Sequence, residues 1–102
     1  MNKDHVYFIR IGARDANLYK IGTTNNIERR MHEHERKYKQ PIEVLWVSPP
    51  YSKYTTLRVE DTTKEKWRTQ SGFHYIPNDR FVIEPSINQV KIKVRKEWTI
   101  DI

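Results

Sequence analysis

The chain contains no cysteine and no long hydrophobic run. The absence of cysteine excludes disulfide bonds and metal sites built from thiolates. No apolar stretch approaches the roughly 18 residues that a membrane-spanning helix needs, and the N-terminal MNKDHVYFIR has no signal-peptide core. We therefore expect a cytoplasmic protein that does not contact a membrane.

The chain also lacks internal repeats, low-complexity tracts and any segment that reads as a linker between domains. Its 102 residues are enough for one small domain, which we expect to span residues 1–102. Only 36% of the residues are hydrophobic, but twelve aromatic residues (three Trp, six Tyr and three Phe) can supply much of the buried area.

Positive charge is in excess, because 19 Lys and Arg oppose 13 Asp and Glu and give a formal net charge of +6. This balance favours polyanionic partners such as nucleic acid. Many small basic proteins do not bind DNA, so composition alone leaves the partner open.

Two predicted strands open the chain, HVYFIRI at residues 5–11 and LYKIG at residues 18–22. The first alternates in the two-residue period of a strand that is buried mainly on one face. The polar segment between the two strands predicts a hairpin with a long loop.

The hairpin has an expected register, in which the end of the first strand pairs with the start of the second. Ile9 then lies opposite Lys20, and Tyr7 lies opposite Gly22, with all four on one side of the sheet. Tyr7 and Lys20 become diagonal neighbours.

A helix is predicted to follow, capped by Asn25 or Asn26. Asn25 and Glu28 have the spacing of a capping box. Residues at helical spacing form the stripe expected to pack on the sheet: Ile27, Met31, His34 and Tyr38. Arg30 is at the edge of this stripe.

The rest of the chain adds a largely buried strand at 42–47, a helix at about 55–67, and strand-like segments at 80–85 and 90–102. Segment 72–80 is expected to be a turn, although His74 and Tyr75 within it could stack on a base. Four residues of the second helix are expected to share one face, and one of them is acidic: Leu57, Glu60, Lys64 and Trp67. The predicted class is α+β, a small mixed, mainly antiparallel central sheet flanked by helices, in the order ββαβα plus C-terminal strands.

An ordered set of short motifs resembles the GIY-YIG nuclease superfamily, over roughly residues 6–81. His5-Val6-Tyr7 stands at the first strand motif and Lys20-Ile21-Gly22 at the second, with His5 in place of a glycine and Lys20 in place of a tyrosine. The match continues with Arg30 and His34 on the first helix and Glu60 on the second. The lysine resembles a branch of the superfamily in which YKIG is usual.

The resemblance implies a metal-dependent endonuclease that hydrolyses DNA phosphodiester bonds. Tyr7 would take a proton from the attacking water, with its pKa lowered by Lys20. Arg30 would offer its planar fork of donors to the phosphate oxygens. His34 would contact phosphate or orient a catalytic group, although a hydrogen-bonded core histidine fits its position equally well.

The resemblance also implies a divalent ion, Mg²⁺ or Mn²⁺, held by Glu60 to stabilise the leaving group. Asp61 is a rival ligand, and either carboxylate could instead pair with a basic residue on the same helix. Scattered histidines such as His5 and His74 are poor candidates for a zinc site.

Expected contacts to the substrate come from several further positions. Gly22 leaves room for the nucleic-acid backbone, Arg29 lies beside Arg30, and a basic face of the last predicted strand supplies Lys91, Lys93 and Arg95. So short a chain has no room for a separate DNA-recognition domain. We therefore expect either low sequence selectivity or specificity that comes from a homo-oligomer or a partner protein.

Two other interpretations remain open from the sequence. A catalytically inactive module on the same fold would bind nucleic acid without cutting it. A basic interaction protein with an unrelated fold would carry the motif set by coincidence.

Overall fold

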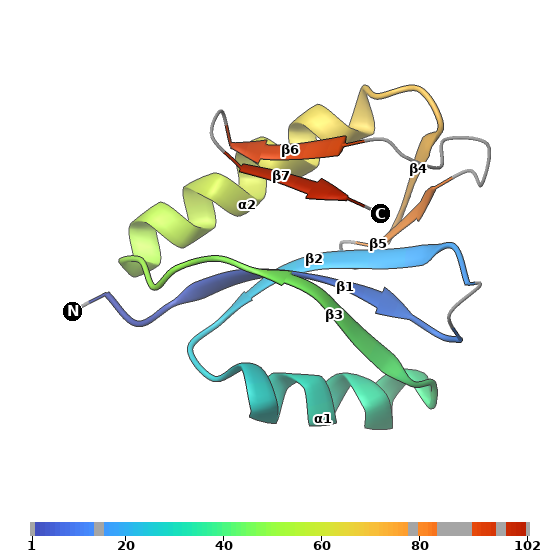
Figure 1. The fold of residues 1–102 in the computed structure, drawn as a ribbon, viewed down its shortest axis with the longest axis horizontal. Coiled ribbons are helices and arrows are strands. Elements are labelled where there is room, and N and C mark those ends of the chain that lie inside the picture. The colour runs from blue at the N-terminus through green and yellow to red at the C-terminus, as the bar shows by residue number, and fades with distance from the viewer. Residues whose placement is uncertain (1, 14–15, 78–79, 84–90, 96–97, 102) are drawn as a thin grey trace.

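A computed structural model describes residues 2–13, 16–77, 80–83, 91–95 and 98–101, with side chains placed up to residue 83. It is a small α+β fold, as predicted, in which one helix covers each face of a five-stranded antiparallel sheet (Figure 1). The elements follow in the order β1 (His5–Ile11), β2 (Leu18–Thr24), α1 (Ile27–Tyr38), β3 (Ile42–Val47), α2 (Lys53–Arg68), β4 (Phe73–Ile76), β5 (Arg80–Ile83), β6 (Lys91–Arg95) and β7 (Trp98–Asp101).

The strand order across the sheet is β3-β1-β2-β5-β4, and each of these neighbouring pairs is antiparallel. The sheet is therefore antiparallel across the described strands, where we had predicted a mixed, mainly antiparallel one. The β1–β2 register is the predicted one, with Ile9 opposite Lys20 and Tyr7 opposite Gly22. This pairing places the four residues on the face that α1 covers.

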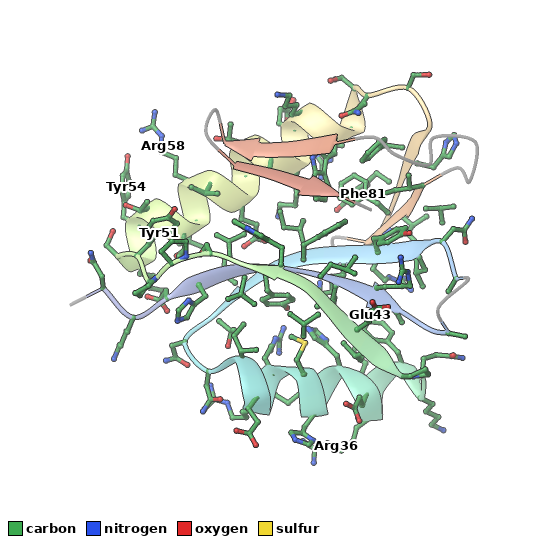
Figure 2. All side chains as sticks on the ribbon, viewed as in Figure 1. Arg36, Glu43, Tyr51, Tyr54, Arg58 and Phe81 are labelled. Carbon is green, nitrogen blue, oxygen red and sulfur yellow. The ribbon has the colours of Figure 1, made fainter. Side chains whose placement is uncertain are left out.

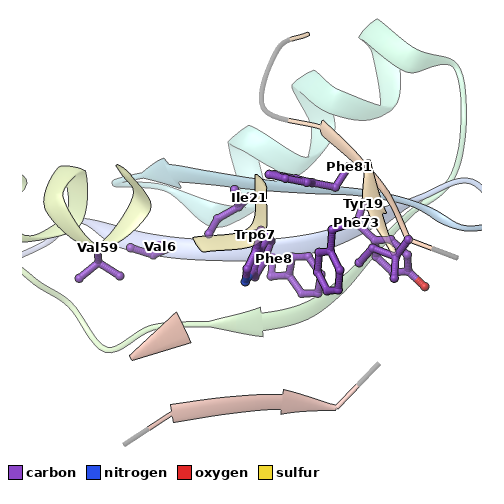
Figure 3. Close-up of a cluster of buried hydrophobic side chains, with 9 residues drawn as sticks. Val6, Phe8, Tyr19, Ile21, Val59, Trp67, Phe73 and Phe81 are labelled. Atoms are coloured by element: carbon purple, nitrogen blue, oxygen red, sulfur yellow. The ribbon is translucent and has the colours of Figure 1, made fainter. Parts of the chain in front are cut away.

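Strand β1 is buried on both faces, not mainly on one as predicted. Val6 and Phe8 belong to a core cluster with Val59 and Trp67 of α2 (Figure 3). The alternate positions of β1, including Tyr7, contact a second cluster that includes Met31 of α1. The reason is that one helix covers each face of this central strand, so both sets of alternating side chains are shielded from water.

Helix α1 begins one residue later than the predicted capping box requires. Asn26 is the N-cap, and its side-chain oxygen accepts a hydrogen bond from the backbone N–H of Arg29 at 3.0 Å. The predicted capping box of Asn25 and Glu28 was therefore wrong by one residue. The predicted stripe does face the sheet, since Met31 and His34 are its buried residues.

Helix α2 begins at Lys53, earlier than predicted, with Ser52 as its N-cap. The face predicted for burial is only partly correct, because Leu57 is exposed. Threonines replace it on the buried face, which consists of Thr56, Val59, Glu60, Thr63 and Trp67. Two of the threonine hydroxyls bond backbone carbonyls of the preceding turn, which satisfies them without water. Neither α2 nor any other helix of the described segments is long and apolar enough to cross a membrane.

Three predictions for the remaining strands need correction. Strand β3 lies at the edge of the sheet, so it is only partly buried. Residues 73–76, which we had predicted as part of a turn, form β4 and pair with β5. The C-terminal segment forms two antiparallel strands, β6 and β7, which make a separate two-stranded sheet near α2 (Figure 1).

Candidate functional site

Tyr7 is at the centre of the site, on the α1 face of β1 and fully buried. Its ring lies directly over Gly22 of the neighbouring strand: a Cβ placed on Gly22 would come within 2.4 Å of the Tyr7 hydroxyl oxygen. The space above the glycine is thus occupied by the phenol. Our expectation that Gly22 makes room for a nucleic-acid backbone is therefore wrong.

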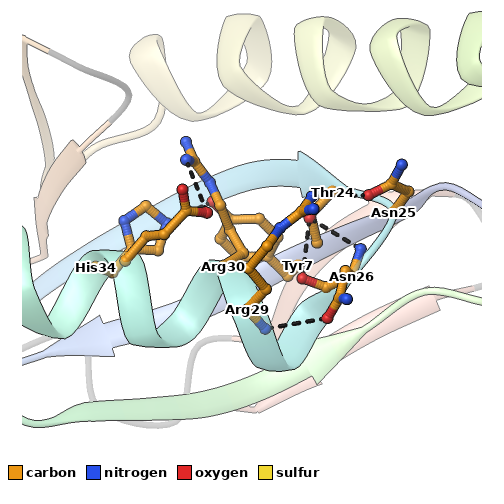
Figure 4. Close-up of polar contacts among 8 residues, drawn as sticks. Tyr7, Thr24, Asn25, Asn26, Arg29, Arg30 and His34 are labelled. Carbon is orange, nitrogen blue, oxygen red and sulfur yellow. Dashed lines mark hydrogen bonds and ion pairs between the residues drawn. The ribbon is translucent and has the colours of Figure 1, made fainter.

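Two side chains of α1, Arg30 and His34, lie beside Tyr7 (Figure 4). The hydroxyl oxygen of Tyr7 lies 2.7 Å from Nε2 of His34, and the guanidinium of Arg30 is close enough for its positive charge to act on the phenol. When the His34 proton is on Nδ1, Nε2 accepts the proton of the Tyr7 hydroxyl, whereas the guanidinium of Arg30 can only donate. Arg30 and His34 are four residues apart, so they project from the same face of the helix.

The surroundings of Tyr7 raise the pKa of its phenol. Burial is the main cause, and it outweighs the lowering effect of Arg30, while the negative charge of Glu60 raises the pKa further. We had predicted a lowered pKa with Lys20 as the cause. That prediction was wrong because desolvation dominates and because Arg30 is the cation that lowers the pKa.

His34 has the opposite shift. Burial, followed by the positive charges of Arg30, Lys20 and Lys37, lowers its pKa to about 4. The imidazole is therefore neutral near pH 7 and keeps one nitrogen as an acceptor. Lys20, on β2 and 7% exposed, acts on this histidine through its charge.

Arg30 is the part of the cluster that solvent reaches. Its side chain is 41% exposed, and it forms a 3.7 Å ion pair with Glu33 on the next turn. The neighbouring Arg29 is exposed and turns elsewhere, donating to the side chain of Asn25 at 3.1 Å. The structure therefore brings together Tyr7, Lys20, Arg30 and His34, but leaves Arg29 outside the cluster.

Glu60 comes from α2, on the other side of the sheet from α1, yet its charge acts on Tyr7. The residue is 8% exposed, and Lys64 donates to its Oε1 at 3.0 Å. The rival Asp61 has a side chain that is 77% exposed. Of the two carboxylates, Glu60 is the one that lies near the site.

A divalent ion would have Glu60 as its protein ligand here. The described part of the chain holds no group of three or more His, Asp or Glu side chains that could bind a metal by themselves. One buried carboxylate fits Mg²⁺, which commonly uses one or two carboxylates together with waters and substrate phosphates. Lys64 would then share or give up the carboxylate oxygen that it binds.

Comparison with known families assigns the chain through nearly its whole length, because residues 4–98 match the T5orf172 domain. The chain belongs to the T5orf172 domain family. Our assignment to the GIY-YIG superfamily was therefore wrong. Short motifs of two or three residues occur in many sequences, whereas this match spans residues 4–98. No curated protein and no solved structure matches the chain.

Of the other predicted positions in the T5orf172 domain, Tyr75 and His5 have partners outside the cluster. The strand β6 contains Lys91, Lys93 and Arg95, whose side chains are outside the described residues. Tyr75, proposed to stack on a base, has the guanidinium of Arg68 4.2 Å from its ring centroid. His5 lies 2.8 Å from the carbonyl of Ser48, to which its Nδ1–H donates, so it links β1 to the segment after β3.

Sequence reasoning did not select three residues that extend the cluster along α1: Lys37, Tyr38 and Arg80. The Tyr38 ring stacks on His34, with centroids 5.7 Å apart. Tyr38 was on the predicted helical stripe, which was the one signal available. Arg80 could not be found from sequence, because it reaches the site only through the pairing of β5 with β2.

Proposed function

We propose that this T5orf172 domain is a metal-dependent endonuclease that hydrolyses DNA phosphodiester bonds. One observation carries the proposal: the buried hydroxyl of Tyr7 lies 2.7 Å from a neutral histidine, and the charges of an arginine and a carboxylate act on it. This arrangement combines a proton acceptor with a phosphate-binding cation. The net charge of +6 favours a polyanionic substrate.

Proton transfer follows the hydrogen bond between Tyr7 and His34. A neutral phenol can take a proton from water only if it passes its own proton on, and His34 Nε2 is 2.7 Å away. The water oxygen then forms a bond to phosphorus, and the bond from phosphorus to the departing 3′ oxygen breaks. The low pKa of His34 opposes this transfer in the free protein. A bound phosphate brings negative charge, which offsets the nearby cations and favours protonation of the histidine.

Arg30 connects the buried phenol with the surface. Tyr7 is 0% exposed, so the attacking water can reach it only if a covering group moves. Arg30 would be that group, because its charge acts on the phenol and its side chain is 41% exposed. Phosphate oxygens offer the guanidinium two acceptors in a bidentate geometry, which favours its movement away from Tyr7 when substrate binds.

Glu60 would hold the divalent ion, Mg²⁺ or Mn²⁺. Such an ion neutralises charge on the phosphate and stabilises the leaving oxygen. Before substrate binds, Lys64 partly neutralises the carboxylate from 3.0 Å.

A second candidate is a nucleic-acid-binding module that does not cut. The complete burial of Tyr7 and the ion pair of Glu60 with Lys64 favour it, because both describe a stable resting structure. In this case Arg30 would still bind phosphate, and the Tyr7–His34 contact would only hold α1 on the sheet.

Incubation of the purified protein with supercoiled plasmid and with single-stranded DNA, in Mg²⁺, Mn²⁺ or EDTA, separates the two candidates. We expect metal-dependent nicking that Arg30→Lys reduces more than it reduces DNA affinity, since lysine keeps the charge but loses the bidentate fork. Arg36→Lys is the matched control, because Arg36 projects from α1 away from the sheet (Figure 2). Binding without cleavage in every metal would overturn the nuclease proposal and leave the binding module.

A further inference from the structure

Two cations flank one aromatic ring at the C-terminal end of α1. Lys37 Nζ lies 5.4 Å from the centroid of the Tyr38 ring, and the guanidinium carbon of Arg80 lies 5.6 Å from it. The hydroxyl of Tyr38 is buried and has no hydrogen-bond partner within the described residues. Arg80 Nε donates to the backbone carbonyl of Pro77 at 3.0 Å. Two positive groups thus meet at a buried hydroxyl for which the described residues supply no acceptor.

Arg80 reaches this position through the sheet. It is paired with Lys20 across β2 and β5, and opposed residues of an antiparallel pair lie on the same face. Both residues therefore lie on the α1 side, where Lys20 and Lys37 each lower the pKa of His34. The positive groups form a continuous path along α1, from Arg30 past His34 to Lys37 and Arg80.

The spacing of this path suits successive phosphates of one strand. Arg30 and Lys37 are seven residues apart on a helix, which is about 10 Å along its axis. Phosphates of one DNA strand in a duplex advance about 3.4 Å each along the helix axis. A strand whose phosphate binds Arg30 would place another roughly three nucleotides away beside Lys37.

We propose that Lys37, Tyr38 and Arg80 form a second phosphate-binding subsite, which holds the same nucleic-acid strand that binds at Arg30. The subsite deepens the proposed function, and rests on it for the choice of nucleic acid as the ligand. The first subsite is the phosphate-binding position at Arg30. Glu33 forms an ion pair with Arg30 at 3.7 Å, so it partly neutralises this first subsite. Lys37 and Arg80 bind the backbone without reading bases, so the subsite sets the position of the strand and not its sequence.

The test is the salt dependence of DNA binding, measured in EDTA so that no cleavage occurs. The probes are fluorescent oligonucleotides of about 20 nucleotides, single-stranded and duplex. Each lost phosphate contact should reduce the slope of log K against log salt by about 0.7 to 0.9. We expect this reduction for Lys37→Ala and for Arg80→Ala, whereas Arg36→Ala, which removes an equal charge from the outer side of α1, should leave the slope unchanged.

A second variant protects the test against misfolding. Arg80→Lys keeps the charge, so it should preserve the salt slope and the thermal unfolding midpoint even if Arg80→Ala lowers the latter. The proposal is overturned if Lys37→Ala and Arg80→Ala give the slope of Arg36→Ala, or if the wild type does not bind DNA. A wild type that cleaves without any change of slope in these variants would overturn the subsite alone. If the salt slope falls in Lys37→Ala and Arg80→Ala but the wild type never cleaves DNA, the hydrolysis proposal alone is overturned.

Discussion

The hydroxyl oxygen of Tyr7 lies within 2.4 Å of the point where residue 22 would carry a Cβ, so the phenol can occupy its position only because residue 22 is glycine. The two residues are direct partners across β1 and β2. The absent side chain lets the ring lie against the strand and extend toward α1, where it meets His34 at 2.7 Å. Glycine at this position is therefore part of the site without touching a ligand.

Gly22→Ala should destabilise the fold by roughly 1–3 kcal/mol, because the new methyl group overlaps the Tyr7 ring in a packed core. Alanine would otherwise be favoured over glycine in a strand, so a loss of stability reports the overlap. Urea unfolding measures it. In a double-mutant cycle, Tyr7→Ala removes the obstructing ring, and the double variant should lose less than the sum of the single losses. Additive losses would contradict this contact.

Tyr7→Phe should reduce nicking activity by about 10²- to 10⁴-fold, the usual contribution of a general base. The variant should still fold, because the ring keeps its packing, but it leaves His34 Nε2 without its partner at a cost of about 1–3 kcal/mol. Initial rates and urea unfolding measure the two effects. Tyr54→Phe, on the exposed side of α2, is the control and should change neither. Full activity in Tyr7→Phe would rule out the proton route through the phenol.

The low pKa of His34 predicts a pH-dependent stability. The pKa is about 4 in the folded protein, against about 6.5 in an unfolded chain. Between these values the unfolded state binds more protons, so the free energy of unfolding should fall as the pH drops from about 6.5 toward 4 and should not change through this group above that window. The slope contributed by His34 cannot exceed about 1.4 kcal/mol per pH unit.

Urea unfolding of the wild type and of His34→Gln at several pH values isolates this contribution. The difference between the two proteins should shrink as the pH falls, because glutamine does not titrate. Equal pH dependence in both proteins would show that His34 is not a buried neutral group.

Glu60→Gln should abolish metal-dependent cleavage and leave DNA affinity unchanged or improved, because a negative charge that repels phosphate is removed. Nicking assays and binding in EDTA measure the two effects. Asp61→Asn is the control, since its exposed carboxylate lies on the same helix but outside the site. If Asp61→Asn abolished cleavage while Glu60→Gln did not, the choice of metal ligand would be reversed.

Local sequence patterns were sufficient for several features of the fold. The alternation in residues 5–11, the helical stripe of Met31 and His34, and the register that sets Tyr7 against Gly22 all follow from short-range periodicity. Predictions failed where a second element decides burial: α2 covers the far face of β1, and β3 lies at an edge of the sheet. Neither fact is present in the segment itself.

The residue pattern was enough to predict a small basic α+β domain and to bring Tyr7, Lys20, Arg30 and His34 into one neighbourhood, because strand pairing and helical spacing are local geometry. How these groups behave depends on the packing of the whole fold. Burial between sheet and α1 raises the pKa of Tyr7 and lowers that of His34, and strand β5 brings Arg80 from the far end of the chain to Tyr38. The physical reason is that desolvation and charge interactions depend on every group packed around a side chain, and most of these groups are distant in sequence.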